Sequence, residues 1–141
     1  MSNVSPSLVT SAPKSSLGRT IAYWVTTVLI VFVLGLGGVV DLMQPEEAVK
    51  GVTELGYPVY LCTILGVWKV LGAIALLLPG TPRLKEWAYA GTFFDLTGAA
   101  ASHFYSHDPA AKLAIPLVIT LIAVASWALR PASRRLAGPL V

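Results

Sequence analysis

Long apolar segments, separated by short polar ones, decide what this chain can fold into. Residues 21–40 and 113–129 carry no charge, residues 59–78 carry only Lys69, and residues 87–104 carry a single acid, Asp95. Each segment is about long enough to cross a hydrocarbon core of ~30 Å as a helix rising about 1.5 Å per residue. Charged residues make up only 12% of the chain, against ~25% in soluble domains. We therefore predict an all-α integral membrane protein whose four spans form a four-helix bundle.

Basic residues mark three of the polar segments: the one before the first span, the one between the second and third spans, and the one after the fourth. They are Lys14, Arg19, Arg83, Lys85, Arg130, Arg134 and Arg135. The other two connections hold most of the acids and only Lys50 and Lys112 as bases. Because lysine and arginine collect on the cytoplasmic side, both termini are predicted to be cytoplasmic, in the cell inner membrane. Nucleic acid is not a predicted partner, since the basic residues are divided among short segments.

Three parts are predicted along the chain. Residues 1–18, rich in serine and proline, are expected to be a disordered cytoplasmic tail, residues 19–130 the four-span domain, and residues 131–141 a basic cytoplasmic tail. Between the first two spans, Pro45 suits a helix start, Glu46 and Glu47 suit its first turn, and Gly56 can end it. This connection is predicted to be a short amphipathic helix on the outer surface, with a solvated connector as the alternative.

Lys69 lies at the centre of its span, where a charge costs about 2.5 to 3.5 kcal/mol and usually has a partner inside the protein. It lies nine residues before Leu78, the inner end of its span, and Asp95 lies nine residues after Glu86, where the next span starts. The two helices are joined by a short turn and run antiparallel, so both side chains are expected ~13 Å from the inner end. We predict a buried ion pair between Lys69 and Asp95.

Further side chains complete this predicted intramembrane polar site. Ser102 and His103 lie about two turns outward of Asp95, and Trp68, beside Lys69, is a candidate to pack on a ligand. Two interpretations of the pair stay open. In the first it fixes the register of two helices and does no chemistry. In the second it anchors the polar group of an amphipathic ligand or relays a proton.

Other polar residues lie toward the outer side. Asp41 ends the first span and Glu54 lies in the outer connection, so a cluster of both with His103 is predicted above the ion pair. His103 and His107 are one helical turn apart, a spacing that can hold a divalent ion. The chain has no H-E-x-x-H pattern, however, and no metal site is predicted. The single Cys62 argues against a self-contained disulfide oxidoreductase.

Small residues form a strip at helical spacing on each of two spans. The strip on the second span is Cys62, Gly66, Lys69 and Ala73, and that on the third is Gly91, Asp95, Gly98 and Ser102. Small residues allow membrane helices to approach closely. We expect the two strips to meet each other or to line the bundle core, with Gly35 and Gly38 giving the first span a comparable surface.

Two sequence elements, K-x-x-G and K-E-W-A-Y-x-G…F-D…G-A…S-H, resemble the pattern of the DoxX-like family of small four-span membrane proteins, and the likeness extends over most of residues 20–130. The residues that carry it are Lys69, Gly72, Lys85, Glu86, Trp87, Gly91, Asp95, Gly98, Ala99, Ser102 and His103. The resemblance implies a four-helix membrane bundle. Family members include a proposed subunit of a thiosulfate:quinone oxidoreductase, proteins associated with redox or stress responses, and a receptor-assembly factor.

Two alternative functions are therefore predicted. The first is a redox-associated membrane protein that binds a quinone or another amphipathic small molecule at Lys69, Asp95 and His103. The second is a non-enzymatic assembly factor or accessory subunit in which the Lys69–Asp95 pair is purely structural. The predicted partners are membrane lipid, a small-molecule ligand, and another membrane protein or a second copy of the chain. A small transporter is less favoured because no broken helix or internal repeat is evident. Whether the chain is an enzyme stays open, since it has no redox or metal motif of its own.

Overall fold

The computed structural model describes residues 16–138, and within that range the chain is all-α, as predicted. Its elements are α1 (Leu17–Met43), α2 (Glu46–Glu54), α3 (Tyr60–Leu77), α4 (Pro82–Tyr105), α5 (Ala110–Leu129) and a short 3-10 helix (Ala132–Arg134). Most of the predicted tail at residues 1–18 lies outside the described residues. Helix α1 already begins at Leu17, slightly before the predicted start of the membrane domain at residue 19.

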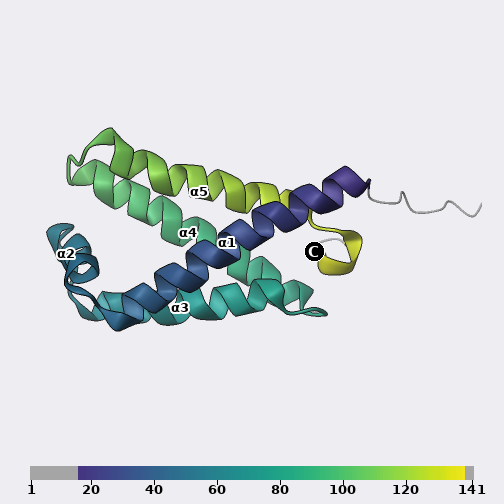
Figure 1. The fold of residues 1–141 in the computed structure, drawn as a ribbon, viewed down its shortest axis with the longest axis horizontal. Coiled ribbons are helices and arrows are strands. Elements are labelled where there is room, and N and C mark those ends of the chain that lie inside the picture. Colours follow the sequence, from purple (N-terminus) through teal and green to yellow (C-terminus); the bar gives the residue numbers. More distant parts are fainter. Residues whose placement is uncertain (1–15, 139–141) are drawn as a thin grey trace, which may run out of the picture.

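Local sequence explains where the helices begin and end. The Ser16 hydroxyl accepts a hydrogen bond from the Arg19 backbone N–H at 3.3 Å and caps the start of α1. Helix α1 ends at Met43, because Gln44 adopts a left-handed conformation and proline follows. Gly80, with φ of +72°, makes the turn between α3 and α4. The connections from α3 to α4 and from α4 to α5 are short turns, whereas α1 and α3 are joined through α2, and consecutive long helices run in opposite directions (Figure 1).

Three helices of the described part are long and apolar enough to cross a membrane by length and composition: α1, α3 and α5. Helix α4, at 24 residues, is as long but less apolar, because it carries Asp95, His103 and several small or hydroxyl-bearing residues. All four predicted long segments are thus helical, and three of them have the composition of spans. The chain is a multi-pass membrane protein.

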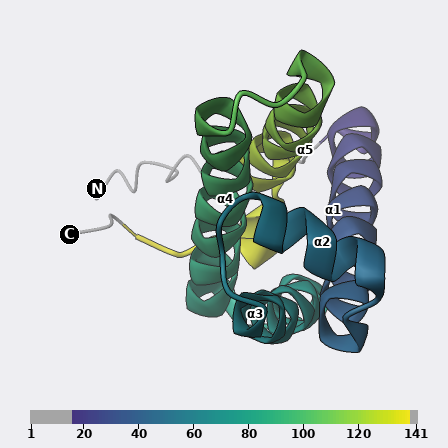
Figure 2. The ribbon, with the colours of Figure 1, turned by 90° about the vertical axis from the view of Figure 1, so that its left-hand side faces the viewer.

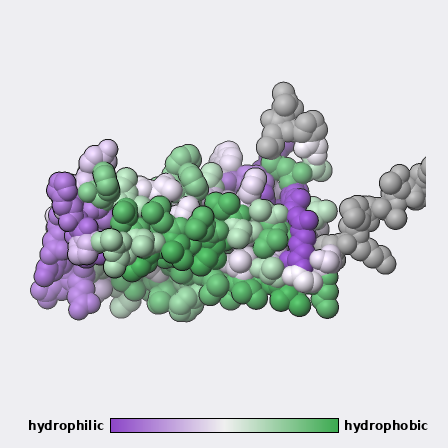
Figure 3. All heavy atoms as spheres, turned by 90° about the horizontal axis from the view of Figure 1, so that it is seen from above, coloured by the Kyte–Doolittle hydropathy of each residue, from purple (hydrophilic) through white to green (hydrophobic). Residues whose placement is uncertain are grey.

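The four long helices lie alongside one another (Figure 1). Helix α1 packs against α3 and α5, while α4 packs mainly against α5 and less closely against α3. The short helix predicted between the first two long helices is present as α2, and it lies across one end of the group (Figure 2). On the face shown in Figure 3, hydrophobic residues cover most of the length, and hydrophilic residues gather at the end where α2 lies and again toward the opposite end. This pattern suits a protein whose sides face lipid.

A small polar network is built into the centre of the helix group. The Ser126 hydroxyl on α5 is hydrogen-bonded to the Thr27 hydroxyl of α1 and to the Tyr89 hydroxyl of α4, each at 2.7 Å. Ser126 and Thr27 are both fully buried. One serine therefore ties three helices together, beside an apolar core that includes Ile30 and Leu76.

We expect Ser126→Ala to lower the free energy of unfolding by about 1–3 kcal/mol, because two buried hydroxyls lose the oxygen they share. The measurement is SDS titration of the protein purified in detergent micelles. Ser106→Ala is the control, since Ser106 is exposed and its change is expected to stay within about 0.5 kcal/mol. Equal effects of the two substitutions would contradict a structural role for this network.

Helices α1 and α3 cross in close contact at two glycines, one on each helix. A Cβ added at Gly38 would lie 2.9 Å from the carbonyl oxygen of Gly66, and one added at Gly66 would lie 2.8 Å from the carbonyl oxygen of Gly38. The predicted small-residue strip of the second span therefore packs closely on the first span, and it approaches the strip of the third span at Lys69 and Asp95, whose charged atoms are 3.9 Å apart.

Gly91 and Gly98 on α4 have no atom within 4 Å of an added Cβ. Of the two predicted arrangements, packing of the strips along their length was wrong, because α3 packs closely on α1 and less closely on α4. Cys62, Gly66 and Ala73 of the α3 strip are instead buried in the bundle, whereas Gly91 and Gly98 are exposed.

Candidate functional site

Lys69 lies at the centre of a charged group contributed by three helices. Its ammonium nitrogen Nζ donates a hydrogen bond to Oδ2 of Asp41 on α1 at 2.8 Å, and it lies 3.9 Å from Oδ2 of Asp95 on α4. The side chains are largely buried, with 24% of Lys69, 16% of Asp41 and 22% of Asp95 exposed. We call these three residues the charged triad.

The structure brings Lys69 and Asp95 together at the depth that the sequence indicates, but Asp41 is the nearer partner. Asp41 was expected in an outer cluster with Glu54 and His103. The glycine crossing explains its position, since Asp41 follows Gly38 by one helical turn and Lys69 follows Gly66 by one turn. Because α1 and α3 run in opposite directions, Lys69 lies beside Gly38, with its Cβ 3.0 Å from a Cβ added there, and Asp41 lies near Gly66. The long side chain of Lys69 reaches along the crossing to the Asp41 carboxylate.

The triad holds two carboxylates for one ammonium group. A charge in an apolar environment is costly unless it is paired. Lys69 is hydrogen-bonded to Asp41 alone, so the carboxylate of Asp95 is the member of the triad without a close donor. Among residues 16–138, no donor lies within hydrogen-bonding distance of the Asp95 carboxylate.

A cavity of about 500 Å³ opens between α3 and α4 beside the triad. Lys69 and Asp95 both line it, whereas most of its remaining wall is apolar. Its large apolar side chains include Trp68, Leu71, Trp87 and Phe94. Ligand pockets of ~300–1,000 Å³ with mostly apolar walls and a few polar groups are typical of small-molecule sites. The sequence pointed to Trp68, but no periodic signal marked Trp87 or Phe94, whose places depend on how far α4 stands from α3.

Other predicted residues lie at the end of the molecule near α2. His103 Nδ1 lies 2.7 Å from Oδ2 of Asp108, and Ser102 is hydrogen-bonded to the Tyr57 hydroxyl at 2.8 Å. The hydrogen bond with His103, aided by Lys112, lowers the pKa of the Asp108 carboxyl from its usual value. No hydrogen bond or ion pair within residues 16–138 joins these residues to the charged triad. Ser102 and His103, which were predicted to belong to the intramembrane polar site, are therefore bonded elsewhere.

Glu54 and His103 line a second cavity of about 370 Å³ under α2, together with Asp108 and Lys112. Glu54 is also paired with Lys50 at 3.7 Å on the exposed side of α2. His107 has a left-handed backbone and is exposed. Within the described range, no group of three or more His, Cys, Asp or Glu side chains is arranged to hold a metal ion.

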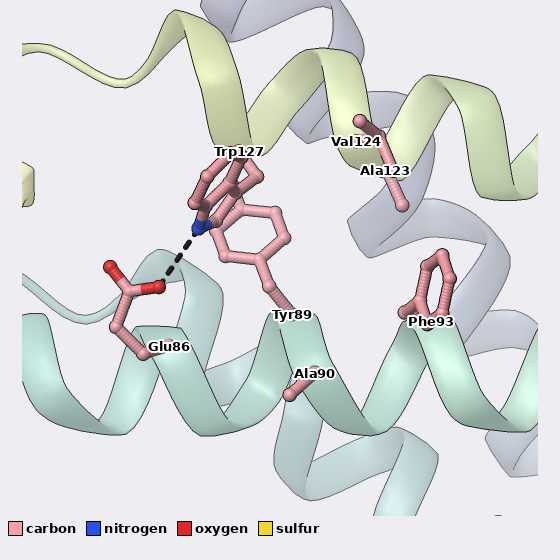
Figure 4. A pocket seen from close by; sticks show the side chains of 7 residues that line it. All are labelled: Glu86, Tyr89, Ala90, Phe93, Ala123, Val124 and Trp127. Carbon is pink, nitrogen blue, oxygen red and sulfur yellow. Dashed lines mark hydrogen bonds between the residues drawn. The ribbon is translucent and has the colours of Figure 1, made fainter.

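A third cavity, of about 240 Å³, lies between α4 and α5 near the chain ends (Figure 4). Glu86 at its edge accepts hydrogen bonds from Trp127 Nε1 at 2.8 Å and from Arg130 Nη2 at 2.6 Å. Its other walls are apolar, and they include Phe93 and Ala123. Both carboxylate oxygens of Glu86 are already bonded, so this cavity offers less unused chemistry than the one beside the triad.

Buried basic groups stabilise the same end. Lys85 is 1% exposed and donates to the carbonyl groups of Ala75 and Leu76, each at 2.9 Å, and of Leu78 at the end of α3. A cation at a helix C-terminus satisfies free carbonyl groups and complements the helix dipole. Lys85, one of the basic residues that predict a cytoplasmic side, therefore also has a structural role.

The fold and the triad define the class: a multi-pass membrane protein with a charged centre among apolar helices. The model of the DoxX-like family matches residues 25–126, and the chain belongs to this family. The resemblance seen in the sequence motifs is thereby confirmed. No curated protein and no solved structure matches the chain.

Proposed function

We propose that this DoxX-like membrane protein binds an amphipathic small molecule in the cavity between α3 and α4, with a quinone as the candidate ligand in a redox-associated role. The observation that carries the proposal is that Lys69 and Asp95 both line a cavity whose other walls are mainly apolar. An ammonium group can donate a hydrogen bond to a quinone carbonyl, while Trp68 and Trp87 offer flat surfaces to a ring. Electron transfer would require a partner protein or a bound cofactor.

The proposal includes four spans with both termini in the cytoplasm of a cell with an inner membrane. Helix α4 lies alongside α5, which has the composition of a span, and this supports α4 as the fourth (Figure 1). Arg19, Lys85 and Arg130 lie close to helix ends that the alternating helix directions place on one side. Such a concentration of basic residues is typical of the cytoplasmic side.

The four tryptophans allow a direct binding test. Trp68 and Trp87 line the cavity, whereas Trp24 and Trp127 do not. We expect decylubiquinone, added to the purified protein in micelles, to quench tryptophan fluorescence with saturation. The quenching is expected to survive when Trp24 and Trp127 are replaced by phenylalanine.

The matched control replaces Trp68 and Trp87 by phenylalanine and leaves the other two tryptophans in place. In that protein, the saturable part of the quenching should disappear. Quenching that rises linearly in every variant would mean that the quinone only dissolves in the micelle. Saturable quenching that depends on Trp127 would place the ligand in the cavity near Glu86 and contradict the proposed site.

One observation favours the alternative function, an assembly factor or accessory subunit with a purely structural ion pair. The short Lys69–Asp41 hydrogen bond lies one turn from the Gly38–Gly66 crossing, where it helps to hold α1 on α3. A protein that binds no amphiphile but is recovered from native membranes with a defined protein partner would support this alternative.

A further inference from the structure

The two charged groups that line the α3–α4 cavity differ in their unused hydrogen-bonding capacity. Lys69 has three N–H donors and uses one of them on Asp41. Asp95 is an acceptor, and no group in residues 16–138 donates a hydrogen bond to it. The Nζ of Lys69 and the Oδ2 of Asp95 are 3.9 Å apart, too far for a direct hydrogen bond. A ligand atom between them therefore meets a donor on one side and an acceptor on the other.

Charge restricts which head group fits this position. A carboxylate or phosphate would add a negative group to a triad that already holds two carboxylates for one ammonium. An ammonium head group can donate to Asp95 but has no lone pair to accept a hydrogen bond from Lys69. A carbonyl group can accept from Lys69 but leaves Asp95 without a donor. A hydroxyl group is neutral and both donates and accepts, so it can satisfy both residues at once.

The walls indicate what carries this hydroxyl. Trp68, Trp87 and Phe94 line the same cavity as the charged pair. Aromatic side chains pack favourably on flat rings, by stacking or by edge-to-face contact. The leucines of the wall offer an apolar surface for an alkyl chain. An aromatic ring with a hydroxyl group and an apolar tail matches all three features.

We infer that the cavity takes an amphiphile with a phenolic hydroxyl head group, as in a hydroquinone, whose O–H donates to Asp95 and whose oxygen accepts from Lys69. This inference rests on the proposed function and narrows its ligand class. It means that the reduced, hydroxyl-bearing form of a quinone binds more tightly than the oxidised form, which has carbonyl groups alone. Asp95 is then the residue that selects the ligand, and Asp41 holds Lys69 in place behind it.

The test compares para-octylphenol with its methyl ether, which keeps the ring, the oxygen and the chain but cannot donate. Dissociation constants are measured by native mass spectrometry of the full-length protein released from micelles. We expect the phenol to bind about tenfold more tightly than the ether, since a hydrogen bond to a charged group contributes at least that much. In Asp95→Asn, whose neutral amide is a weaker acceptor, the preference should fall towards unity.

The wild-type comparison needs no variant, so it stands even if Asp95→Asn folds poorly. Equal affinities of phenol and ether for the wild-type protein would overturn the inference and leave the proposed ligand cavity intact. Absence of binding by phenol, ether and decylubiquinone alike would overturn both. An unchanged preference in folded Asp95→Asn would also overturn the role given to Asp95.

Discussion

Gly38→Ala is expected to lower the free energy of unfolding by about 2–3 kcal/mol, because the new methyl group has no room. Its Cβ would lie 2.9 Å from the Gly66 carbonyl oxygen and 3.0 Å from Lys69 Cβ. The first of these is a backbone atom that cannot rotate away, so α1 and α3 must separate. Since Asp41 and Lys69 pair across this same contact between α1 and α3, the separation should also lengthen their hydrogen bond. SDS titration in micelles measures the stability.

Gly37→Ala is a matched control on the neighbouring residue of the same helix. A Cβ at Gly37 meets no atom within 4 Å, and alanine is the better helix former, so the change is expected to stay within about 1 kcal/mol of zero. Gly66→Ala should be as harmful as Gly38→Ala, because its Cβ would lie 2.7 Å from Leu42 Cγ and 2.8 Å from the Gly38 carbonyl oxygen. Equal stabilities of Gly37→Ala and Gly38→Ala would show that this helix crossing is looser than described.

Lys69→Met is the second substitution with a large expected effect, a loss of about 3 kcal/mol in the free energy of unfolding. It leaves the largely buried carboxylates of Asp41 and Asp95 without their shared cation. Asp41→Asn should cost about 2 kcal/mol, because it weakens the 2.8 Å hydrogen bond to Lys69. Asp95→Asn should cost less than about 1 kcal/mol, since Lys69 lies 3.9 Å from it and keeps Asp41.

The double variant Lys69→Met with Asp41→Asn controls for unpaired charge. It removes the ammonium and one carboxylate together, so we expect it to be more stable than Lys69→Met alone. A double-mutant cycle over the two residues then gives their interaction free energy. If Asp95→Asn proved more damaging than Asp41→Asn, the assignment of Asp41 as the main partner of Lys69 would be wrong.

Much of the architecture could be predicted because hydropathy and helix length leave few choices for such a chain. The four long helices, the short α2 and their turns follow from apolar runs and from proline and glycine at their ends. The depth of Lys69 and Asp95 followed from counting outward from one turn. Helix contacts were harder to predict, because a strip of small residues shows where a close contact can form but not which helix provides it. Gly66 thus packs on Gly38, whereas no atom lies within 4 Å of a Cβ added at Gly91.

Which residues form the site also depends on which helices pack against each other. Asp41 looked like an end-of-span residue, yet its spacing from Gly38 equals that of Lys69 from Gly66. Three residues is close to one helical turn, so both side chains lie on the glycine faces that cross, and this was the available signal for their pairing. The cavity wall could not be found in this way, since Trp87 and Phe94 belong to the family motif but nothing in the motif indicates that they line a cavity. The cavity is present because α4 packs more closely on α5 than it does on α3.

The measurement that tests the central claim most directly is quinone binding to a variant whose cavity has been filled. Gly91 lines the cavity and has open space around its Cβ position, so Gly91→Leu should fill part of the site while leaving the three charged residues in place. Gly98→Leu, two turns further along α4 and equally free of close contacts, is the matched control outside the cavity. We predict that Gly91→Leu loses saturable quenching by decylubiquinone and that Gly98→Leu keeps it. Unchanged binding by folded Gly91→Leu would contradict the claim that the α3–α4 cavity is the ligand site.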